Sequence, residues 1–436
     1  MDRLLYQNLV TWKHTEGRKP LMLEGARQVG KTFLLKKLGK EEYENFYYLN
    51  FDEHPKARTL FEDNISAESI LKKLAIFFQT PITPHNSLIC FDEIQECDGA
   101  LASLKYFCED APDYHIAVAG SLLGVKLKGN KGFPVGKVTI RHLYPLSFIE
   151  FLQAMGKQGW IQLLDELTVG ETIPDIFHHE LIDALKTYFF VGGMPEAVAR
   201  YIKTNNLEEV RQVHKDIIRT YELDFAKHAT PADAAKISLI WDAIPSQLSK
   251  ENKKFIYSVV RESARAREYE SAIQWLVDAR LVLKCYQISK PGIPLKSYAN
   301  HEIFKTYFLD VGLLGAMSQL RSDVLLENTQ LFTEYKGALT ENYIAQSLTT
   351  FLDHQLFYWS SEGKAEVDFV VDIHGKLLPI EVKSGHSTKK KSLLIYCEKY
   401  SPKHAIRVSP MNMACNGSLL NIPLYAINEL SQLMRD

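Results

Sequence analysis

Short apolar runs alternate with amphipathic stretches over the first 120 residues of this 436-residue chain. Apolar runs predict strands, whereas apolar residues that recur every three or four positions predict helices. We expect strands at 20–24, 46–51, 87–91 and 115–119, and helices at 4–12, 32–38 and 66–78. Strands that alternate with helices predict a parallel sheet covered on both faces, with ligands bound beyond the carboxyl ends of the strands.

The turn between the first strand and the next helix, residues 25–32, fits the phosphate-binding pattern G-x-x-x-x-G-K-T. Gly25 and Gly30 allow a tight turn that brings backbone N–H groups onto phosphate oxygens. Lys31 supplies charge for the β- and γ-phosphates, and the Thr32 hydroxyl is a hard oxygen ligand for Mg²⁺. The predicted ATP-binding residues are Gly25, Ala26, Arg27, Gln28, Val29, Gly30, Lys31 and Thr32.

Two Phe-Asp-Glu triplets, at 51–53 and 91–93, compete for the second nucleotide motif. The triplet at 91–93 follows a wholly apolar run, as expected after a buried central strand, and the other follows a more polar one. We therefore expect Asp92 to hold Mg²⁺, directly or through water, and Glu93 to orient and deprotonate the attacking water. The alternative for both residues is a solvated strand end.

Two further residues are weaker candidates for the nucleotide site. Ser121 follows the fourth strand, where it could sense the γ-phosphate or simply form a turn. A helix predicted at 180–190 is broken at 191–195. The break resembles the Gly-x-Pro element that related ATPases place against the base from a helical lid, which makes Pro195 a candidate contact. A plain helix boundary is the alternative.

Residues 235–298 are predicted to form three helices followed by two strands. The helices are expected at 235–248, 252–264 and 269–279, and the strands at 281–286 and 296–298. This order predicts a winged helix. Basic residues gather here: Lys250, Lys253, Lys254, Arg261, Arg265 and Arg267. Acidic neighbours dilute the charge, so DNA binding and a lid or protein-docking role both stay open.

Two C-terminal strands, predicted at 366–372 and 377–383, form a hairpin that carries Asp368, Glu381 and Lys383 in the spacing D-x₁₂-E-x-K. Alternation along a strand places Glu381 and Lys383 on one face, and Asp368 can approach them from the neighbouring strand. Two carboxylates beside a lysine can bind Mg²⁺ and position a water for phosphodiester cleavage. The alternative is an ordinary hairpin with a salt bridge on its solvated face.

A helix predicted at 340–348 precedes the hairpin and carries Glu341. Together these elements resemble the PD-(D/E)xK nuclease core. The resemblance implies a restriction-endonuclease-like domain with Glu341, Asp368 and Glu381 as metal ligands and Asp368, Glu381 and Lys383 as the catalytic set. Three lysines at 389–391 could meet a phosphate backbone. The same fold can also persist as a docking module without cleavage.

Composition says more about the partners and the compartment of the chain than about the reaction it catalyses. The 51 Lys and Arg residues nearly balance 53 Asp and Glu, so any nucleic-acid surface must be local. Six cysteines without a Cys-x-x-Cys pair favour reduced thiols in the cytoplasm over disulfides or a zinc site. No run approaches the ~20 apolar residues of a membrane span, and none resembles a secretory signal, so we expect no membrane partner.

Taken together, the motifs resemble those of a large, mostly uncharacterised group of prokaryotic AAA-type ATP-binding proteins with a C-terminal domain of unknown function. The resemblance rests on residues 25–32, 91–93, 120–121, 144–151, 192–195, 310–314, 366–368 and 381–383. It implies an α/β architecture of four domains. These are an AAA+ P-loop parallel sheet (1–155), a helical lid (156–230), a winged-helix-like domain (231–325) and a nuclease-like α/β domain (326–436).

One position departs from the group. Its members often carry Gly-Arg before a Pro-Leu-Ser-Phe segment, where this chain has Gly136-Lys137. If that arginine acts across a subunit interface, Lys137 cannot reproduce the bidentate hydrogen bonds of its planar guanidinium group.

We therefore expect an ATP-hydrolysing AAA-type protein with a nuclease-like domain that acts on DNA or docks to it. Two alternatives stay open: an ATP-regulated, metal-dependent DNA endonuclease, and a nucleotide-dependent protein-interaction switch that barely turns over. ATP, ADP and Mg²⁺ are the expected ligands. DNA, a protein partner and further copies of the chain are the candidate partners.

Overall fold

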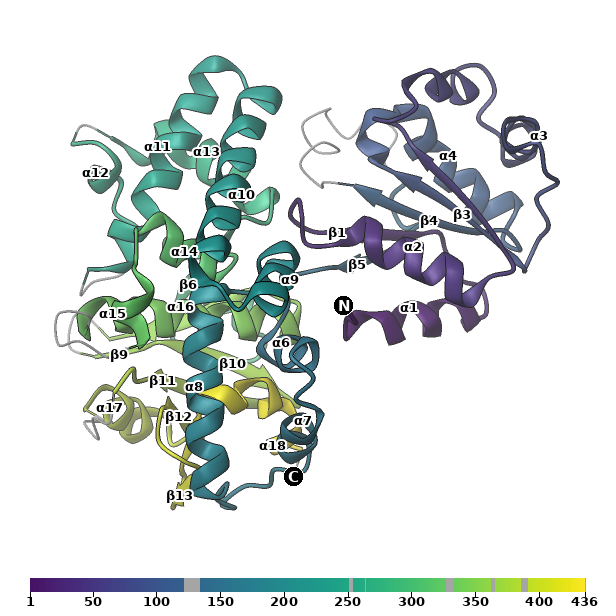
Figure 1. The fold of residues 1–436 in the computed structure, drawn as a ribbon. Coiled ribbons are helices and arrows are strands. Elements are labelled where there is room, and N and C mark those ends of the chain that lie inside the picture. Colours follow the sequence, from purple (N-terminus) through teal and green to yellow (C-terminus); the bar gives the residue numbers. More distant parts are fainter. Residues whose placement is uncertain are drawn as a thin grey trace. The chain divides into compact units, whose positions relative to one another are not determined.

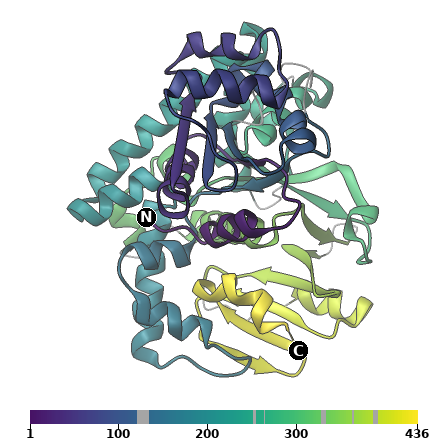
Figure 2. The same ribbon diagram turned by 90° about the vertical axis from the view of Figure 1, so that its right-hand side faces the viewer.

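The computed structural model describes residues 1–120, 134–250, 254–262, 264–326, 333–361, 365–385 and 391–435. Of residues 325–326 and 333–334 it describes the backbone alone. The chain divides into two compact units, Met1–Tyr144 and Pro145–Asp436. Figures 1 and 2 show the elements of each unit.

The first unit holds a parallel five-stranded sheet in the order β2-β3-β4-β1-β5. Its strands are β1 (Leu21–Glu24), β2 (Asn45–Asn50), β3 (Ser87–Asp92), β4 (His115–Gly120) and β5 (Thr139–His142). Its helices are α1 (Leu5–His14), α2 (Lys31–Glu42), α3 (Ala67–Phe78) and α4 (Asp98–Asp110), with 3₁₀ turns η1 (Pro55–Phe61) and η2 (Ile94–Glu96). The predicted parallel sheet is confirmed, and β5 is a strand that the sequence pattern did not predict.

The central strands explain why the nucleotide motifs meet. All residues of β3 and β4 are buried, as the apolar runs predicted, and α3 and α4 pack over one face of the sheet. β1 and β3 flank β4 in parallel, so their carboxyl ends lie at the same edge. The loops that follow β1 and β3 therefore face one another.

The second unit contains thirteen α-helical segments in its described part. They are α6 (Phe148–Ala154), α7 (Gln158–Asp165), α8 (Asp175–Val191), α9 (Pro195–Thr204), α10 (Leu207–His228), α11 (Pro231–Leu248), α12 (Tyr257–Val260), α13 (Ala266–Asp278), α14 (Val311–Met317), α15 (Ser322–Leu326), α16 (Thr333–Leu352), α17 (Lys391–Tyr400) and α18 (Leu430–Leu433). None of the described helices is long and apolar enough to cross a bilayer.

Two sheets complete the second unit, in the orders β7-β6-β8-β9 and β10-β11-β12-β14-β13. The strands are β6 (Val282–Ile288), β7 (Ala299–Phe308), β8 (Leu356–Ser360), β9 (Glu366–Val367), β10 (Phe369–Ile373), β11 (Lys376–Val382), β12 (Ala405–Ser409), β13 (Ala414–Asn416) and β14 (Leu419–Pro423), with 3₁₀ turns η3 (Leu295–Tyr298) and η5 (Leu424–Glu429). β10 and β11 form the predicted antiparallel hairpin, and β11 then pairs with β12 in parallel. Along the chain, α16 is followed by β8, β9, β10, β11, α17 and β12, and only Asp368 separates β9 from β10, which belong to different sheets.

Two expectations in the middle region were wrong. The helix expected at 252–264 is reduced, among the described residues, to α12. The Gln247 side chain bonds both backbone groups of Ile256, and the Phe255 N–H donates to the Phe304 carbonyl at 2.8 Å. These tertiary hydrogen bonds occupy backbone N–H and C=O groups that a longer helix would need for its own hydrogen bonds. The strand expected at 296–298 is instead η3, and β7 begins only at Ala299.

Candidate functional site

The phosphate loop follows β1 and ends at the start of α2, where unpaired N–H groups can receive an anion. Gly30 caps α2 with φ at 97°, in the left-handed region that favours glycine. A Cβ atom built on Gly25 would lie 2.2 Å from the Leu143 carbonyl oxygen. The positive φ at Gly30 and the close approach of the backbone at Gly25 therefore explain why glycine occupies both positions. The tight turn has the shape that the sequence motif predicted.

Lys31 folds back onto this loop. Its ammonium donates to the carbonyl oxygens of Gly25 at 2.9 Å and Ala26 at 2.8 Å. Loss of hydration lowers the pKa of Lys31 to about 8, although the carboxylates of Glu93 and Asp92 oppose that shift. Because phosphate oxygens carry more negative charge than the two carbonyl oxygens, the ammonium can exchange these contacts for a bound phosphate.

Asp92, at the end of β3, is bound from two sides. Its Oδ2 atom accepts hydrogen bonds from the Thr32 hydroxyl at 2.6 Å and from the Tyr48 hydroxyl at 2.8 Å. The side chain is buried, whereas Asp52 and Glu53 lie exposed in the turn after β2. A hydroxyl and a carboxylate in contact form a hard-oxygen donor pair that fits Mg²⁺. Tyr48, which orients the carboxylate, was not singled out from the sequence.

Glu93 stands between β3 and η2 in the left-handed region, with φ at 51°. Its Oε2 atom accepts a hydrogen bond of 2.5 Å from the amide of buried Gln95. This contact directs the carboxylate that was predicted as the general base. Gln95 also escaped the sequence reasoning, although its spacing two residues after Glu93 is a usable signal.

Two other polar side chains support the loop and were missed. Arg3 is buried and donates to the carbonyl oxygens of Val29 at 2.8 Å and Tyr144 at 2.5 Å. Glu24, the last residue of β1, is buried with its Oε2 atom 3.4 Å from His142 Nε2. The contacts of Arg3 with Tyr144 and of Glu24 with His142 join segments more than 100 residues apart, and no local pattern predicts such contacts.

The remaining candidates lie elsewhere. Ser121 falls outside the described residues. Pro195 is the first residue of α9 in the second unit, and its contact with nucleotide stays a prediction. Lys137 forms an ion pair of 2.8 Å with Glu109 on the surface of the first unit.

In the second unit, four carboxylates gather into what we term the acidic centre: Glu341, Glu366, Asp368 and Glu381. They come from α16, β9, the residue between β9 and β10, and β11. Three of them surround the buried ammonium of Lys305 on β7, at 2.6 Å from Glu366, 3.3 Å from Glu341 and 4.0 Å from Asp368. Sequence reasoning brought Glu341, Asp368 and Glu381 together but missed Lys305.

The Glu381 carboxylate is paired on one side only. Its Oε1 atom accepts a hydrogen bond of 2.6 Å from Lys383, and its Oε2 atom has no hydrogen-bond partner among the described residues. Burial raises the pKa of Glu381, against the opposing effect of Lys383. The hairpin carries an ion pair between buried Glu381 and partly exposed Lys383, so the salt bridge of the alternative interpretation is present but is not fully solvated.

One carboxylate oxygen of Asp368 bonds the protein backbone: its Oδ2 atom accepts a hydrogen bond of 2.7 Å from the Val382 N–H. Within the described part of the chain, no group of three or more His, Cys, Asp and Glu side chains is arranged to hold a metal ion. The acidic centre therefore differs in geometry from the metal site that the sequence motif suggested.

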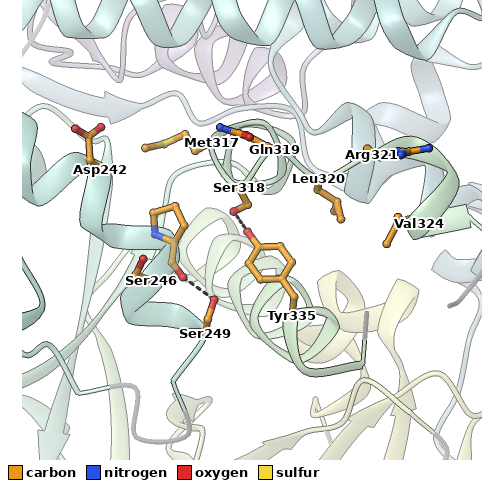
Figure 3. A pocket seen from close by; sticks show the side chains of 11 residues that line it. Asp242, Ser246, Ser249, Met317, Ser318, Gln319, Leu320, Arg321, Val324 and Tyr335 are labelled. Atoms are coloured by element: carbon orange, nitrogen blue, oxygen red, sulfur yellow. Dashed lines mark hydrogen bonds between the residues drawn. The ribbon is translucent and has the colours of Figure 1, made fainter. Parts of the chain in front are cut away.

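A separate cavity of about 870 Å³ opens in the second unit beside α11, α14 and α16 (Figure 3). The Tyr335 hydroxyl points to Ser318 across it, and the Ser249 hydroxyl donates to the Pro245 carbonyl at 2.8 Å. None of the predicted site residues lines this cavity.

Three family matches cover separate parts of the chain. Residues 17–152 match an AAA domain, residues 182–324 a domain of unknown function (DUF8612), and residues 336–426 another domain of unknown function (DUF4143). No curated protein matches the chain.

Solved structures that align with this chain at low sequence identity include three proteins. The Walker-type ATPase PABY2304 of Pyrococcus abyssi is 14% identical, with 73% of this chain and 95% of that chain covered and a TM-score of 0.44. The ORC1 protein of Aeropyrum pernix in complex with DNA is 12% identical, with coverage of 72% and 90% and a TM-score of 0.29. Cdc6p of Pyrobaculum aerophilum is 14% identical, with coverage of 74% and 92% and a TM-score of 0.26. The match of residues 17–152 to an AAA domain agrees with the phosphate loop and the parallel sheet of the first unit.

Proposed function

We propose that this chain binds and hydrolyses ATP with Mg²⁺ in its first unit, and that its second unit docks to or acts on DNA. The observation that carries the ATPase proposal is the contact of 2.6 Å between Thr32 and Asp92, beside the loop that Lys31 closes. Residues of these types in contact can share one Mg²⁺ with the β- and γ-phosphates. Glu93, held by Gln95, would then orient the attacking water and take its proton.

Each candidate residue of the nucleotide site in the first unit has a definite role in this proposal. The loop N–H groups and Lys31 bind the phosphates, and Thr32 and Asp92 hold the metal. The Tyr48 hydroxyl keeps the Asp92 carboxylate in place. Mg²⁺, when bound, neutralises charge that develops on the transferred phosphoryl group.

Two variants test this assignment. Lys31→Ala should abolish tight ATP binding and leave the circular dichroism spectrum and thermal unfolding of the chain unchanged. Glu93→Gln should retain ATP binding and lose hydrolysis, since the amide cannot accept the proton. Unchanged affinity in folded Lys31→Ala would reject the phosphate site. A wild-type chain that binds ATP without turnover would instead support the alternative of a nucleotide-dependent interaction switch.

The proposal for DNA rests on the second unit alone. Helix α16 and the hairpin of β10 and β11 bring Glu341, Asp368, Glu381 and Lys383 into one region, as the resemblance to a nuclease core implies. The preceding region provides helices α11 to α13 and the hairpin of β6 and β7, an order compatible with a winged helix. DNA affinity that falls steeply with salt and is insensitive to sequence would support backbone contacts.

The second candidate is an ATP-regulated endonuclease. The feature in its favour is the pair of Glu381 and Lys383, joined at 2.6 Å beside Asp368. A metal-dependent DNA cleavage assay on wild type and Lys383→Ala tests it directly. Cleavage that the substitution abolishes would establish this candidate, and wild-type DNA binding without cleavage would remove it.

A further inference from the structure

Lys305 is the least expected residue of the acidic centre. It lies on β7, far in sequence from the motif, and its side chain is completely buried. A lysine is seldom fully buried unless it is paired with opposite charge. The reason for its burial must therefore lie in the groups that surround it.

Those groups hold the ammonium on several sides. Glu366 lies at 2.6 Å, Glu341 at 3.3 Å and Asp368 at 4.0 Å, and the ring of Tyr358 lies 4.8 Å from the ammonium. Burial disfavours an unpaired charge, but the three carboxylates at these distances compensate for it. Lys305 thus places a positive charge at the position where the carboxylates converge.

The surrounding oxygens are also engaged with the protein. Glu341 accepts hydrogen bonds from both Lys305 and the Tyr307 hydroxyl, and Asp368 accepts the Val382 N–H. The Oε2 atom of Glu381 lacks a hydrogen-bond partner among the described residues, but the described carboxylates do not form a group that could hold a metal ion.

A divalent ion does not fit beside this lysine. Mg²⁺ needs near-octahedral oxygens at about 2.0–2.1 Å. An ion bound to Glu341 or Glu366 would then lie within roughly 5 Å of a fixed positive charge, which repels it in a poorly hydrated interior. The residues present therefore do not fit the Mg²⁺ that a nuclease core implies.

We infer that Lys305 is the built-in cation of the acidic centre, which takes the place of a metal ion and makes the C-terminal domain a metal-independent, non-cleaving module. The carboxylates then serve to hold β7, β9 and α16 together through Lys305. This inference concerns the second unit alone and does not depend on the ATPase proposal.

The test measures Mn²⁺ binding to the full, nucleotide-free chain by electron paramagnetic resonance, together with the melting temperature in Mn²⁺ and in EDTA. Four proteins are compared: wild type, Asp368→Asn, Lys305→Met and the double variant. Met keeps the length of the lysine stem and removes its charge. Lys284→Met on the neighbouring strand β6 is the matched control, since its ammonium lies over the Phe304 ring and is half-buried.

Wild type and Asp368→Asn should bind the same amount of Mn²⁺, because any ion bound at Thr32 and Asp92 is common to both. Lys305→Met should gain about one Mn²⁺ per chain, with a melting temperature that is low in EDTA and rises with Mn²⁺. The double variant should lose that gain, and Lys284→Met should behave as wild type.

Two results would overturn the inference. The first is Mn²⁺ binding by wild type that Asp368→Asn removes, and this comparison holds even if Lys305→Met fails to fold. The second is a folded Lys305→Met chain that gains no Mn²⁺, because the lysine would then not be what excludes the metal. Neither result bears on ATP hydrolysis, which Lys31→Ala and Glu93→Gln test separately.

Discussion

At the scale of single residues, the nucleotide site depends on side chains outside the phosphate-binding motif at 25–32. Thr32 and Asp92 were predictable, since a hard-oxygen pair at two strand ends follows from residue type and sheet geometry. Tyr48, which donates to the same carboxylate, was not, because its direction depends on the register of β2 against β3. Lys305 was hidden for the same reason: its sequence neighbours give no sign of the carboxylates it meets.

The loop lysine sets a pH dependence for nucleotide binding. Lys31 must be charged to bind phosphate, and its pKa in the free chain is lowered to about 8. ATP·Mg²⁺ affinity should therefore be constant below pH 8. Above pH 8 it should fall by about tenfold per pH unit, because binding must first restore the proton.

Fluorescence or calorimetric titration from pH 6.5 to 10 measures this dependence. Lys31→Arg is the control, since its guanidinium keeps its charge across the range and its affinity, though weaker, should stay flat. An affinity of wild type that does not change between pH 8 and pH 10 would contradict the lowered pKa.

Arg3 should affect the stability of the phosphate loop and its affinity for ATP, although it is not one of the motif residues that bind phosphate. Arg3→Met leaves the buried carbonyl oxygens of Val29 and Tyr144 without their donor. We expect a loss of about 1–3 kcal/mol in the free energy of unfolding and about tenfold weaker ATP binding. Urea denaturation and nucleotide titration measure both effects.

Arg141→Met provides the comparison for Arg3→Met, since Arg141 is exposed and bonds only the carbonyl of its neighbour Ile140 among the contacts described. Its substitution should change neither quantity. Equal effects of the two substitutions would show that Arg3 acts through general charge rather than through the loop.

At the scale of elements, local pattern predicted the helices and strands well where they carry their own boundary signals. Helix α3, predicted at 66–78, spans Ala67–Phe78 and is capped by Ser66, whose side chain accepts the Ser69 N–H. Prediction failed where tertiary contacts decide, as at Ile256, whose backbone is bound by Gln247. β5 was missed because it is a four-residue edge strand with no fully buried residue.

The break between α8 and α9 offers a test at this scale. Gly192 has φ at 67°, and a Cβ atom built on it would lie 2.2 Å from the Asp310 Oδ1 atom. Gly192→Ala should cost about 1–3 kcal/mol from the backbone conformation alone, because Gly192 combines this φ with a ψ of −166°, and more from displacement of the buried Asp310 carboxylate. Chemical denaturation measures the sum.

Gly156→Ala is a matched control, because Gly156 has φ at 72° and a Cβ atom there would meet nothing within 4 Å. A greater loss in Gly192→Ala than in Gly156→Ala measures the contact with Asp310 together with the ψ of −166° at Gly192. If both lose the same stability, Asp310 moves freely and the break is not a tightly packed joint.

At the scale of the whole molecule, the described structure contains a continuous line of hydrogen bonds that begins next to the boundary between the units. The Leu146 N–H donates to the Gly193 carbonyl at 2.6 Å, and the Gly193 N–H donates to Asp310 at 2.6 Å. Asp310 caps α14, whose first N–H donates to Gln346 on α16, the helix that carries Glu341. Each contact links the break to the C-terminal domain, so this line is a candidate route between nucleotide and the second unit.

We predict that nucleotide state changes DNA affinity through this line. The effect is bounded by the difference in nucleotide affinity between two arrangements, typically about 1–3 kcal/mol, or about 5- to 150-fold in the dissociation constant. DNA binding would be measured at one fixed salt concentration with an ATP analogue, with ADP and without nucleotide, because phosphate contacts make affinity steeply salt-dependent.

Linkage requires that DNA shift nucleotide affinity by the same factor as nucleotide shifts DNA affinity, which gives an internal check on the same samples. Asp310→Asn keeps the size of the side chain but replaces a carboxylate that accepts the Gly193 and Leu313 N–H groups with an amide that can match only one of them well. It should reduce the coupling while DNA affinity without nucleotide stays within about twofold, because the substitution lies in the line rather than on a basic surface. DNA affinity that is measurable and equal in all three nucleotide states would show that the second unit binds DNA independently. Coupling that survives unchanged in Asp310→Asn would place the route elsewhere in the chain.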